Sequence, residues 1–152
     1  MFSESLKEGA YGEHAIWNLF IKLPGVRSVV DVRDDKSFQE KDIDFLIEDS
    51  KRQFTAIEVK TDFKAHETGN VVYELSTSNH TGCFEKTEAK YIIYFVPGEN
   101  AAYQIDVKAL RTYLHKARPE ERQMGDNATG FLLPIRDLKA EGVIKRTYEG
   151  VM

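Results

Sequence analysis

The segments Asp42-Ile43-Asp44-Phe45-Leu46-Ile47 and Phe54-Thr55-Ala56-Ile57-Glu58-Val59-Lys60 decide the fold that we predict for this chain. Each has the composition of a β-strand, and the polar stretch 48–52 between them is typical of a turn. Side chains alternate between the two faces of a strand, which places Asp42 and Asp44 on one face of the first. Glu58 and Lys60 share one face of the second. If the two strands pair, acidic groups and a lysine meet on one side of a sheet, as a site for a divalent metal beside a phosphate requires.

Residues 3–23 carry the spacing of an amphipathic helix. Its apolar members are Leu6, Ala10, Ile16, Trp17, Phe20 and Leu23. At roughly 100° per residue, Glu13 falls in the middle of this apolar stripe. A carboxylate in that position is costly unless a metal, a buried cation or a proton compensates it. Gly9 and Gly12 flank Glu13, and we expect them to let another backbone or a ligand come close.

Together, Glu13 on a helix, Asp44 on a strand and Glu58-Val59-Lys60 on the next strand resemble the PD-(D/E)XK nuclease superfamily. Restriction endonucleases and Holliday-junction resolvases belong to this superfamily. The similarity covers residues 9–61, and Ile43 stands where many members have a proline. The resemblance implies an α/β fold with a restriction-endonuclease-like core, in which helices flank a mixed central β-sheet.

The resemblance also implies a Mg²⁺-dependent endonuclease that hydrolyses phosphodiester bonds in DNA and leaves 5′-phosphate ends. Asp44 and Glu58 would ligate Mg²⁺, or Mn²⁺ in its place, together with the backbone carbonyl of Val59. Glu13 would bind the metal through water or help to hold a second ion. Lys60 would orient the attacking water and stabilise the charge that builds on the phosphate.

The aspartate of the motif has two candidates. Asp42 and Asp44 share a face of the predicted strand, so geometry alone does not choose between them. We favour Asp44 because an apolar run follows it directly and fixes its backbone. Asp42 lies nearer to the polar segment 34–41.

Two other classes of protein fit the same sequence. One is a catalytically inactive nuclease-like fold that binds nucleic acid or a protein partner, which the net charge of −4 favours slightly. The other is a structural α/β domain in which the motif has arisen by chance. The four matched groups favour the nuclease, because an inactive site has no need to keep them.

The composition indicates one soluble globular domain over residues 1–152, with 41% hydrophobic and 30% charged residues. No apolar run approaches the roughly 20 residues that a membrane span needs, so no membrane partner is expected. The single Cys83 has no partner for an internal disulfide, and a cytoplasmic location is the simplest expectation. The resemblance allows a homodimer, because small members of the superfamily are often dimers.

The charge is unevenly distributed, with a net −6 over residues 1–100 and +2 over residues 101–152. We therefore expect contacts with DNA from the second part, where 107–117 has helical spacing. The basic residues on one side of this helix are Lys108, Arg111, His115 and Arg118. Phosphate neutralisation by such residues supplies most of the non-specific affinity for DNA. A solvated helix face is the alternative interpretation.

The remaining elements follow from local composition. We predict strands at 71–75, 90–96, 102–106 and 130–133, a helical turn at 135–140, and loops at 61–69, 76–87 and 118–129. The strand 90–96 is the most apolar and is expected to be central. Glu74 on the strand 71–75 is expected to border the site. Four loop residues are candidate substrate contacts: His66, Asn79, His80 and Lys86.

Overall fold

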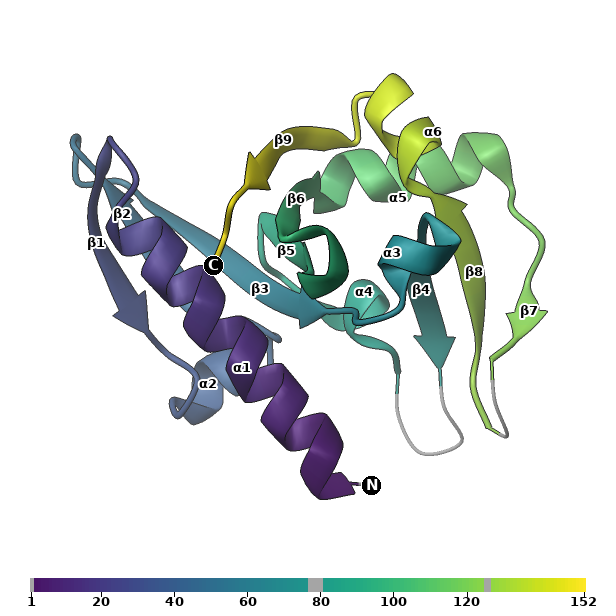
Figure 1. Ribbon diagram of the computed structural model, residues 1–152, viewed down its shortest axis with the longest axis horizontal. Coiled ribbons are helices and arrows are strands. Elements are labelled where there is room, and N and C mark those ends of the chain that lie inside the picture. Colours follow the sequence, from purple (N-terminus) through teal and green to yellow (C-terminus); the bar gives the residue numbers. More distant parts are fainter. Residues whose placement is uncertain (1, 77–80, 125–126) are drawn as a thin grey trace.

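The computed structural model describes residues 2–76, 81–124 and 127–152 (Figure 1). Its elements in chain order are α1 (Phe2–Ile21), β1 (Val26–Asp31), α2 (Lys36–Gln39), β2 (Phe45–Asp49), β3 (Phe54–Thr61), α3 (Ala65–Thr68), β4 (Asn70–Ser76), α4 (Cys83–Lys86), β5 (Tyr91–Val96), η1 (Pro97–Glu99), β6 (Ala101–Asp106), α5 (Val107–Ala117), β7 (Arg122–Gln123), β8 (Thr129–Pro134), α6 (Ile135–Ala140) and β9 (Ile144–Glu149). Two candidate contacts predicted above, Asn79 and His80, lie outside the described residues.

Six strands form a mixed sheet in the order β1-β2-β3-β5-β6-β9. Strands β3 and β5 are parallel, and the other neighbours are antiparallel. As predicted, β2 and β3 pair, with Phe45 opposite Ile57. The apolar strand β5 lies inside the sheet, and only its first residue is not buried. The predicted α/β fold with a mixed central sheet and flanking helices is confirmed.

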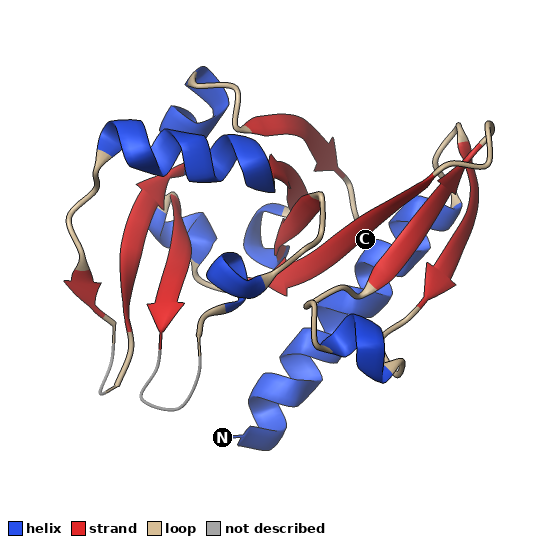
Figure 2. Ribbon diagram, turned by 180° about the vertical axis from the view of Figure 1, so that it is seen from behind, coloured by secondary structure: helices blue, strands red, loops and turns tan. Residues whose placement is uncertain are grey.

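Helix α1 covers one face of β1, β2 and β3, which Figures 1 and 2 show from the front and from behind. Its buried residues Ile16 and Phe20 pack against Phe45 and Ile57 of the strands. The helix extends beyond the sheet at its N-terminus (Figure 1). Leu6 is therefore 61% exposed and Ala10 is also exposed, so their predicted place in the apolar stripe was wrong.

The two glycines of α1 differ in their surroundings. At Gly12 a Cβ atom would clash with the side chain of Thr61 at the end of β3, so the helix can approach the strand here only because the side chain is absent. At Gly9 there is open space instead. The predicted close approach is confirmed at Gly12 and is wrong for Gly9.

The opposite face of the six-stranded sheet is covered by a second sheet, in the order β4-β8-β7, and by α5 and α6. Ile92 and Ile105 of the large sheet pack there with Val71, Leu110 and Leu138. The predicted strand 71–75 exists as part of β4, but it belongs to this second sheet. Strand β4 therefore does not pair with β3, and its residue Glu74 approaches Lys60 of β3 from the sheet that covers this face.

The chain before β2 departs from the predicted strand. We expected the strand to begin at Asp42, whereas β2 begins at Phe45 and Asp42 has a left-handed backbone with φ +50°. A turn after α2 causes this change, since the backbone N–H of Ile43 donates to the carbonyl of Phe38 at 3.1 Å. Ile43 therefore packs with Leu46 and not beside Phe45. The expectation that Asp42 lies on a strand face with Asp44 was wrong.

Several short elements were not predicted. Strands β1 and β9 pair with neighbours distant in sequence, and the loops expected at 61–69, 76–87 and 118–129 contain α3, α4 and β7. Elements of two to six residues carry little periodicity, so tertiary pairing decides them. In the part of the chain that is described, no helix is long and apolar enough to cross a membrane.

Candidate active site

The candidate site lies where β2 separates from β3. The backbone N–H of Asp44 donates to the carbonyl of Ile57 at 2.9 Å. Two residues further along β3, the N–H of Val59 donates to Oδ2 of Asp44 at 2.8 Å. The side chain of Asp44 thus takes the place of a backbone acceptor, and this bond fixes its orientation.

The backbone of Val59 offers a further oxygen at this position. In a β-strand, the N–H and C=O of one residue leave the strand on the same edge. Because the N–H of Val59 points to Asp44, its carbonyl faces that edge too. This geometry is compatible with the predicted use of the Val59 carbonyl as a metal ligand.

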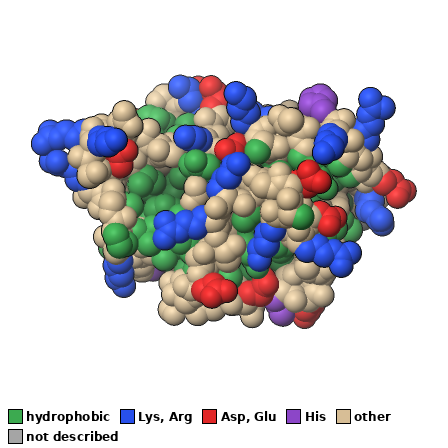
Figure 3. Space-filling view, turned by 90° about the horizontal axis from the view of Figure 1, so that it is seen from above, with side chains coloured by type: hydrophobic (Ala, Val, Ile, Leu, Met, Phe, Trp, Pro, Cys, Tyr) green, Lys and Arg blue, Asp and Glu red, His purple; other side chains and the backbone are tan. Residues whose placement is uncertain are grey.

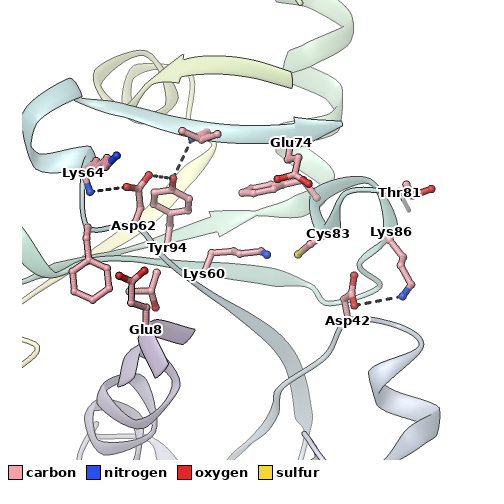
Figure 4. A pocket seen from close by; sticks show the side chains of 14 residues that line it. Glu8, Asp42, Lys60, Asp62, Lys64, Glu74, Thr81, Cys83, Lys86 and Tyr94 are labelled. Carbon is pink, nitrogen blue, oxygen red and sulfur yellow. Dashed lines mark hydrogen bonds and ion pairs between the residues drawn. The ribbon is translucent and has the colours of Figure 1, made fainter. Parts of the chain in front are cut away.

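Glu58 and Lys60 lie on the face of β3 opposite to Ile57 and Val59, which pack under α1. Glu58 is half-buried, and the thiol of Cys83 in α4 donates to its Oε1 at 3.7 Å. Figure 4 shows Lys60 extending toward Cys83. The alternation predicted for β3 therefore brings Glu58 and Lys60 into one half-buried site.

An open pocket of about 1040 Å³ adjoins this site (Figure 4). Lys60 and Thr61 of β3 line it, with Glu8 from α1, Glu74 from β4 and Lys86 from α4. Asp44 and Glu58 lie beside the pocket and not along its lining. The predicted places of Glu74 and Lys86 near the site are confirmed by the geometry.

Two of the acidic groups that the sequence analysis singled out, Glu13 and Asp42, already have a cation. Glu13 accepts from Nη1 of Arg33 at 3.0 Å, so the compensation left open by the sequence is a cation. Asp42 lies 3.6 Å from Nζ of Lys86. Figure 4 shows this pair at the pocket.

Asp44 and Glu58 differ from those two acids. Within the described ranges 2–76, 81–124 and 127–152, neither has an ion-pair partner within 4.0 Å. Burial raises the pKa of Glu58 to about 9, and the charge of Asp44 adds to this shift. Burial also raises the pKa of Asp44 to about 6, although the bond from Val59 opposes it. The charges of Lys60 and Arg33 oppose these shifts but do not outweigh burial, so a further positive charge such as a divalent cation would stabilise the two carboxylates.

Lys60 is the cation nearest to this pair on β3. Burial lowers its pKa, but the surrounding negative groups outweigh burial and the pKa is raised overall. Cys83 is uncharged at neutral pH because burial raises its own pKa to about 12. Glu58 also holds a proton at neutral pH, so the carboxylates of Glu74 and Asp42 remain as causes of the shift. Lys60 is an ammonium group at neutral pH, as charge stabilisation on a phosphate would require.

The donor set fits one hard divalent ion. Carboxylate and carbonyl oxygens are the ligands that Mg²⁺ prefers, and it keeps several waters besides one or two carboxylates. Asp44, Glu58 and the carbonyl of Val59 supply such oxygens. No group of three or more Asp, Glu, His or Cys side chains in the described part of the chain is arranged to hold a metal. A fully protein-made cage is therefore absent from the described residues.

The basic residues of α5 are separate from the pocket. Among the described lining residues of the pocket, none comes from α5. Nη2 of Arg111 donates to the carbonyl of Thr87 at 2.9 Å and to those of Phe84 and Glu85 at 3.3 Å. Arg111 therefore caps the carbonyl groups at the C-terminus of α4. All four predicted DNA contacts, Lys108, Arg111, His115 and Arg118, are exposed, but Arg111 alone is engaged in these bonds to α4.

The surface over α5 and α6, seen from above in Figure 3, carries basic and acidic side chains interspersed with one another. This pattern differs from the continuous basic band that would mark a DNA-binding face. The predicted contacts of α5 with DNA therefore remain a prediction.

His66 is another predicted contact that lies away from the pocket. It pairs with Glu67 at 3.6 Å and packs against Gly98 in η1.

Arg33 and Cys83 lie near the site, although the sequence analysis did not place either residue there. Arg33 is 20 positions from Glu13, and Cys83 is 25 positions from Glu58. No local spacing connects such residues. Because the strand β1 itself was not predicted, nothing in the sequence indicated that Arg33 would lie beside Glu13.

No protein-family model matches this chain, and no curated protein matches it. Among solved structures, it is similar to a bacterial homing endonuclease, I-Ssp6803I, with a TM-score of 0.50 and 18% sequence identity. The similarity covers 70% of this chain and 71% of that chain. At this identity the comparison establishes the kind of fold, a mixed α/β fold found in a nuclease.

Proposed function

We propose that this protein is a metal-dependent nuclease that hydrolyses phosphodiester bonds in DNA. One observation carries the proposal. Glu13 and Asp42 are each paired with a cation, whereas Asp44 and Glu58 are half-buried beside Lys60 and have no ion-pair partner among the described residues. The likeness of the fold to a homing endonuclease supports the same class of activity.

The proposed roles follow from this arrangement. Asp44 and Glu58, with the carbonyl of Val59, hold the metal, and the bond from the Val59 N–H keeps Asp44 in place. A bound Mg²⁺ or Mn²⁺ polarises a phosphoryl oxygen and lowers the pKa of bound water. Lys60 stabilises the charge on the phosphate and orients the attacking water.

The proposal selects Asp44 over Asp42 as the ligand. Asp44 has a fixed orientation and no ion-pair partner among the described residues, whereas Asp42 lies in a turn and is paired with Lys86. A metal at Asp42 would have to displace that lysine.

A panel of labelled DNA and RNA substrates, with Mg²⁺ and with EDTA, tests the proposal. The panel contains duplexes, single strands and branched junctions. Cleavage that requires Mg²⁺ and is lost in Glu58→Gln supports it. Equal cleavage by Glu58→Gln contradicts the assigned site. Binding without cleavage of any substrate would instead identify a nucleic-acid-binding module with a nuclease-like fold.

A further inference from the structure

Arg33, which follows β1, is held in one orientation by the residues around it. Its Nε and Nη2 donate to the two carboxylate oxygens of Asp31 at 2.9 and 2.7 Å. Its guanidinium carbon lies 5.3 Å from the centre of the Phe45 ring. A guanidinium bound in this bidentate manner presents its remaining donors in fixed directions.

The remaining donor, Nη1, is directed at the helix α1. It donates to Oε1 of Glu13 at 3.0 Å, and the side chain of Glu13 is 24% exposed. Arg33 is also close to Asp44 through the backbone, since the N–H of the neighbouring Val32 donates to the carbonyl of Asp44 at 3.1 Å. The guanidinium of Arg33 therefore contacts the helix carboxylate next to one of the proposed metal ligands.

This position matters for how many metal ions the site holds. Glu13 is the only other carboxylate that the family resemblance assigns to metal binding, and a second ion there would meet the guanidinium of Arg33. Like charges at contact distance repel each other, and a guanidinium repels a divalent ion more strongly than a monovalent one. Glu13 can hold a second ion only if Arg33 leaves.

Resting on the proposed function, we infer that Arg33 occupies the place of a second metal ion, so that the site binds one divalent cation. Arg33 is a positioning residue. It neutralises Glu13 and leaves Asp44 and Glu58 as the carboxylates available to the metal.

The number of bound ions tests this inference without cleavage. Mn²⁺ is titrated into the protein in the absence of DNA, and bound ions are counted by electron paramagnetic resonance. We expect one Mn²⁺ per chain in the unaltered protein and two in Arg33→Gln, where Glu13 becomes free. Arg33→Lys restores a count of one, because the positive charge is kept.

Glu13→Gln provides a second, independent measurement if Arg33→Gln does not fold. We expect Glu13→Gln to bind one Mn²⁺ per chain, as the unaltered protein does. If Glu13 held an ion of its own, this variant would bind one ion fewer than the unaltered protein. The double variant Arg33→Gln/Glu13→Gln is expected to return to one ion.

Two ions in the unaltered protein, or one ion in a folded Arg33→Gln, would overturn the inference and leave the nuclease assignment intact. No Mn²⁺ in the unaltered protein would overturn both proposals. Circular dichroism of each variant establishes that it is folded.

Discussion

The carboxylate of Asp44 accepts a hydrogen bond of 2.8 Å from the backbone N–H of Val59, across the point where β2 leaves β3. This single bond links the two halves of the proposed motif, since Val59 lies between Glu58 and Lys60. The bond therefore fixes the side chain of Asp44 relative to Glu58 through the backbone of β3. A site requires such positioning to within about 0.5 Å.

The first prediction compares Asp44→Asn with Asp42→Asn. Asn at 44 can still accept from Val59, so the fold should persist, but the charge needed for the metal is lost. We expect cleavage to fall by about 10²-fold or more, the scale for losing one electrostatic contribution to the transition state. Asp42→Asn should retain most of the activity, because Asn tolerates the left-handed backbone at 42. Initial rates on one labelled duplex measure both. If Asp42→Asn were the inactive variant, Asp42 and not Asp44 would be the metal ligand.

The second prediction concerns pH and the metal-free protein. Burial raises the pKa of Glu58 to about 9 in the folded protein, whereas an exposed glutamate in the unfolded chain has its ordinary value of 4.5. Between these values the folded state holds a proton that unfolding releases, so the free energy of unfolding falls as pH rises. The slope approaches about 1.4 kcal/mol per pH unit for one group.

Urea denaturation in EDTA between pH 6.5 and 8.5 measures this slope. Over that range Asp44, with a pKa of about 6, contributes little to it. Glu58→Gln should flatten the slope, because its amide does not titrate. Since metal binding displaces the proton, the affinity for Mn²⁺ should rise with pH over the same range. A slope unchanged in Glu58→Gln would show that another group holds the proton.

The third prediction separates charge stabilisation from metal binding. Lys60→Met keeps much of the side-chain volume and removes the ammonium group, so the rate should fall by about 10²–10³-fold. The affinity for Mn²⁺ should stay nearly unchanged, because Lys60 is not a ligand. Lys64→Met is the matched control, since Lys64 lines the same pocket but is exposed. A Lys60→Met protein that loses Mn²⁺ while its rate persists would reverse the assigned roles.

The fourth prediction compares the two glycines of α1. A methyl group at Gly12 would clash with Thr61, so Gly12→Ala should lower the free energy of unfolding by about 1–3 kcal/mol. At Gly9, where there is open space, alanine should raise stability by up to about 1 kcal/mol through helix propensity. Thermal denaturation of both variants measures the difference. Equal effects at the two positions would mean that α1 does not approach β3 as described.

The fifth prediction concerns α5. Arg111 binds three carbonyl groups at the end of α4, so Arg111→Gln should lower the free energy of unfolding by about 1–3 kcal/mol. Lys108 and Arg118 are exposed, and their replacement by Gln should leave stability unchanged. If they contact phosphate, the double variant should also reduce the salt dependence of DNA affinity by about 0.9 per lost contact. An unchanged salt dependence would show that α5 is a solvated face.

The amino-acid sequence by itself determined the strand pair, the alternation that separates Glu58 from Val59, and the helix that carries Glu13. These features are local, because the periods of a strand and of a helix are visible within a few consecutive residues. The central strand β5 was predictable for the same reason, since its residues are almost all apolar. The motif that implies a nuclease could be read from the same segments.

The tertiary structure alone decided which of these acids are paired with a cation. Glu13 is neutralised by Arg33, and Asp42 by Lys86, and these partners lie 20 and 44 positions away in the sequence. No local period relates such residues, so only the packing of α1, α2 and α4 around the sheet brings them together. The same packing half-buries Asp44 and Glu58 without an ion-pair partner among the described residues. Strand alternation specifies only the face of the sheet on which a side chain lies, and not what covers that face.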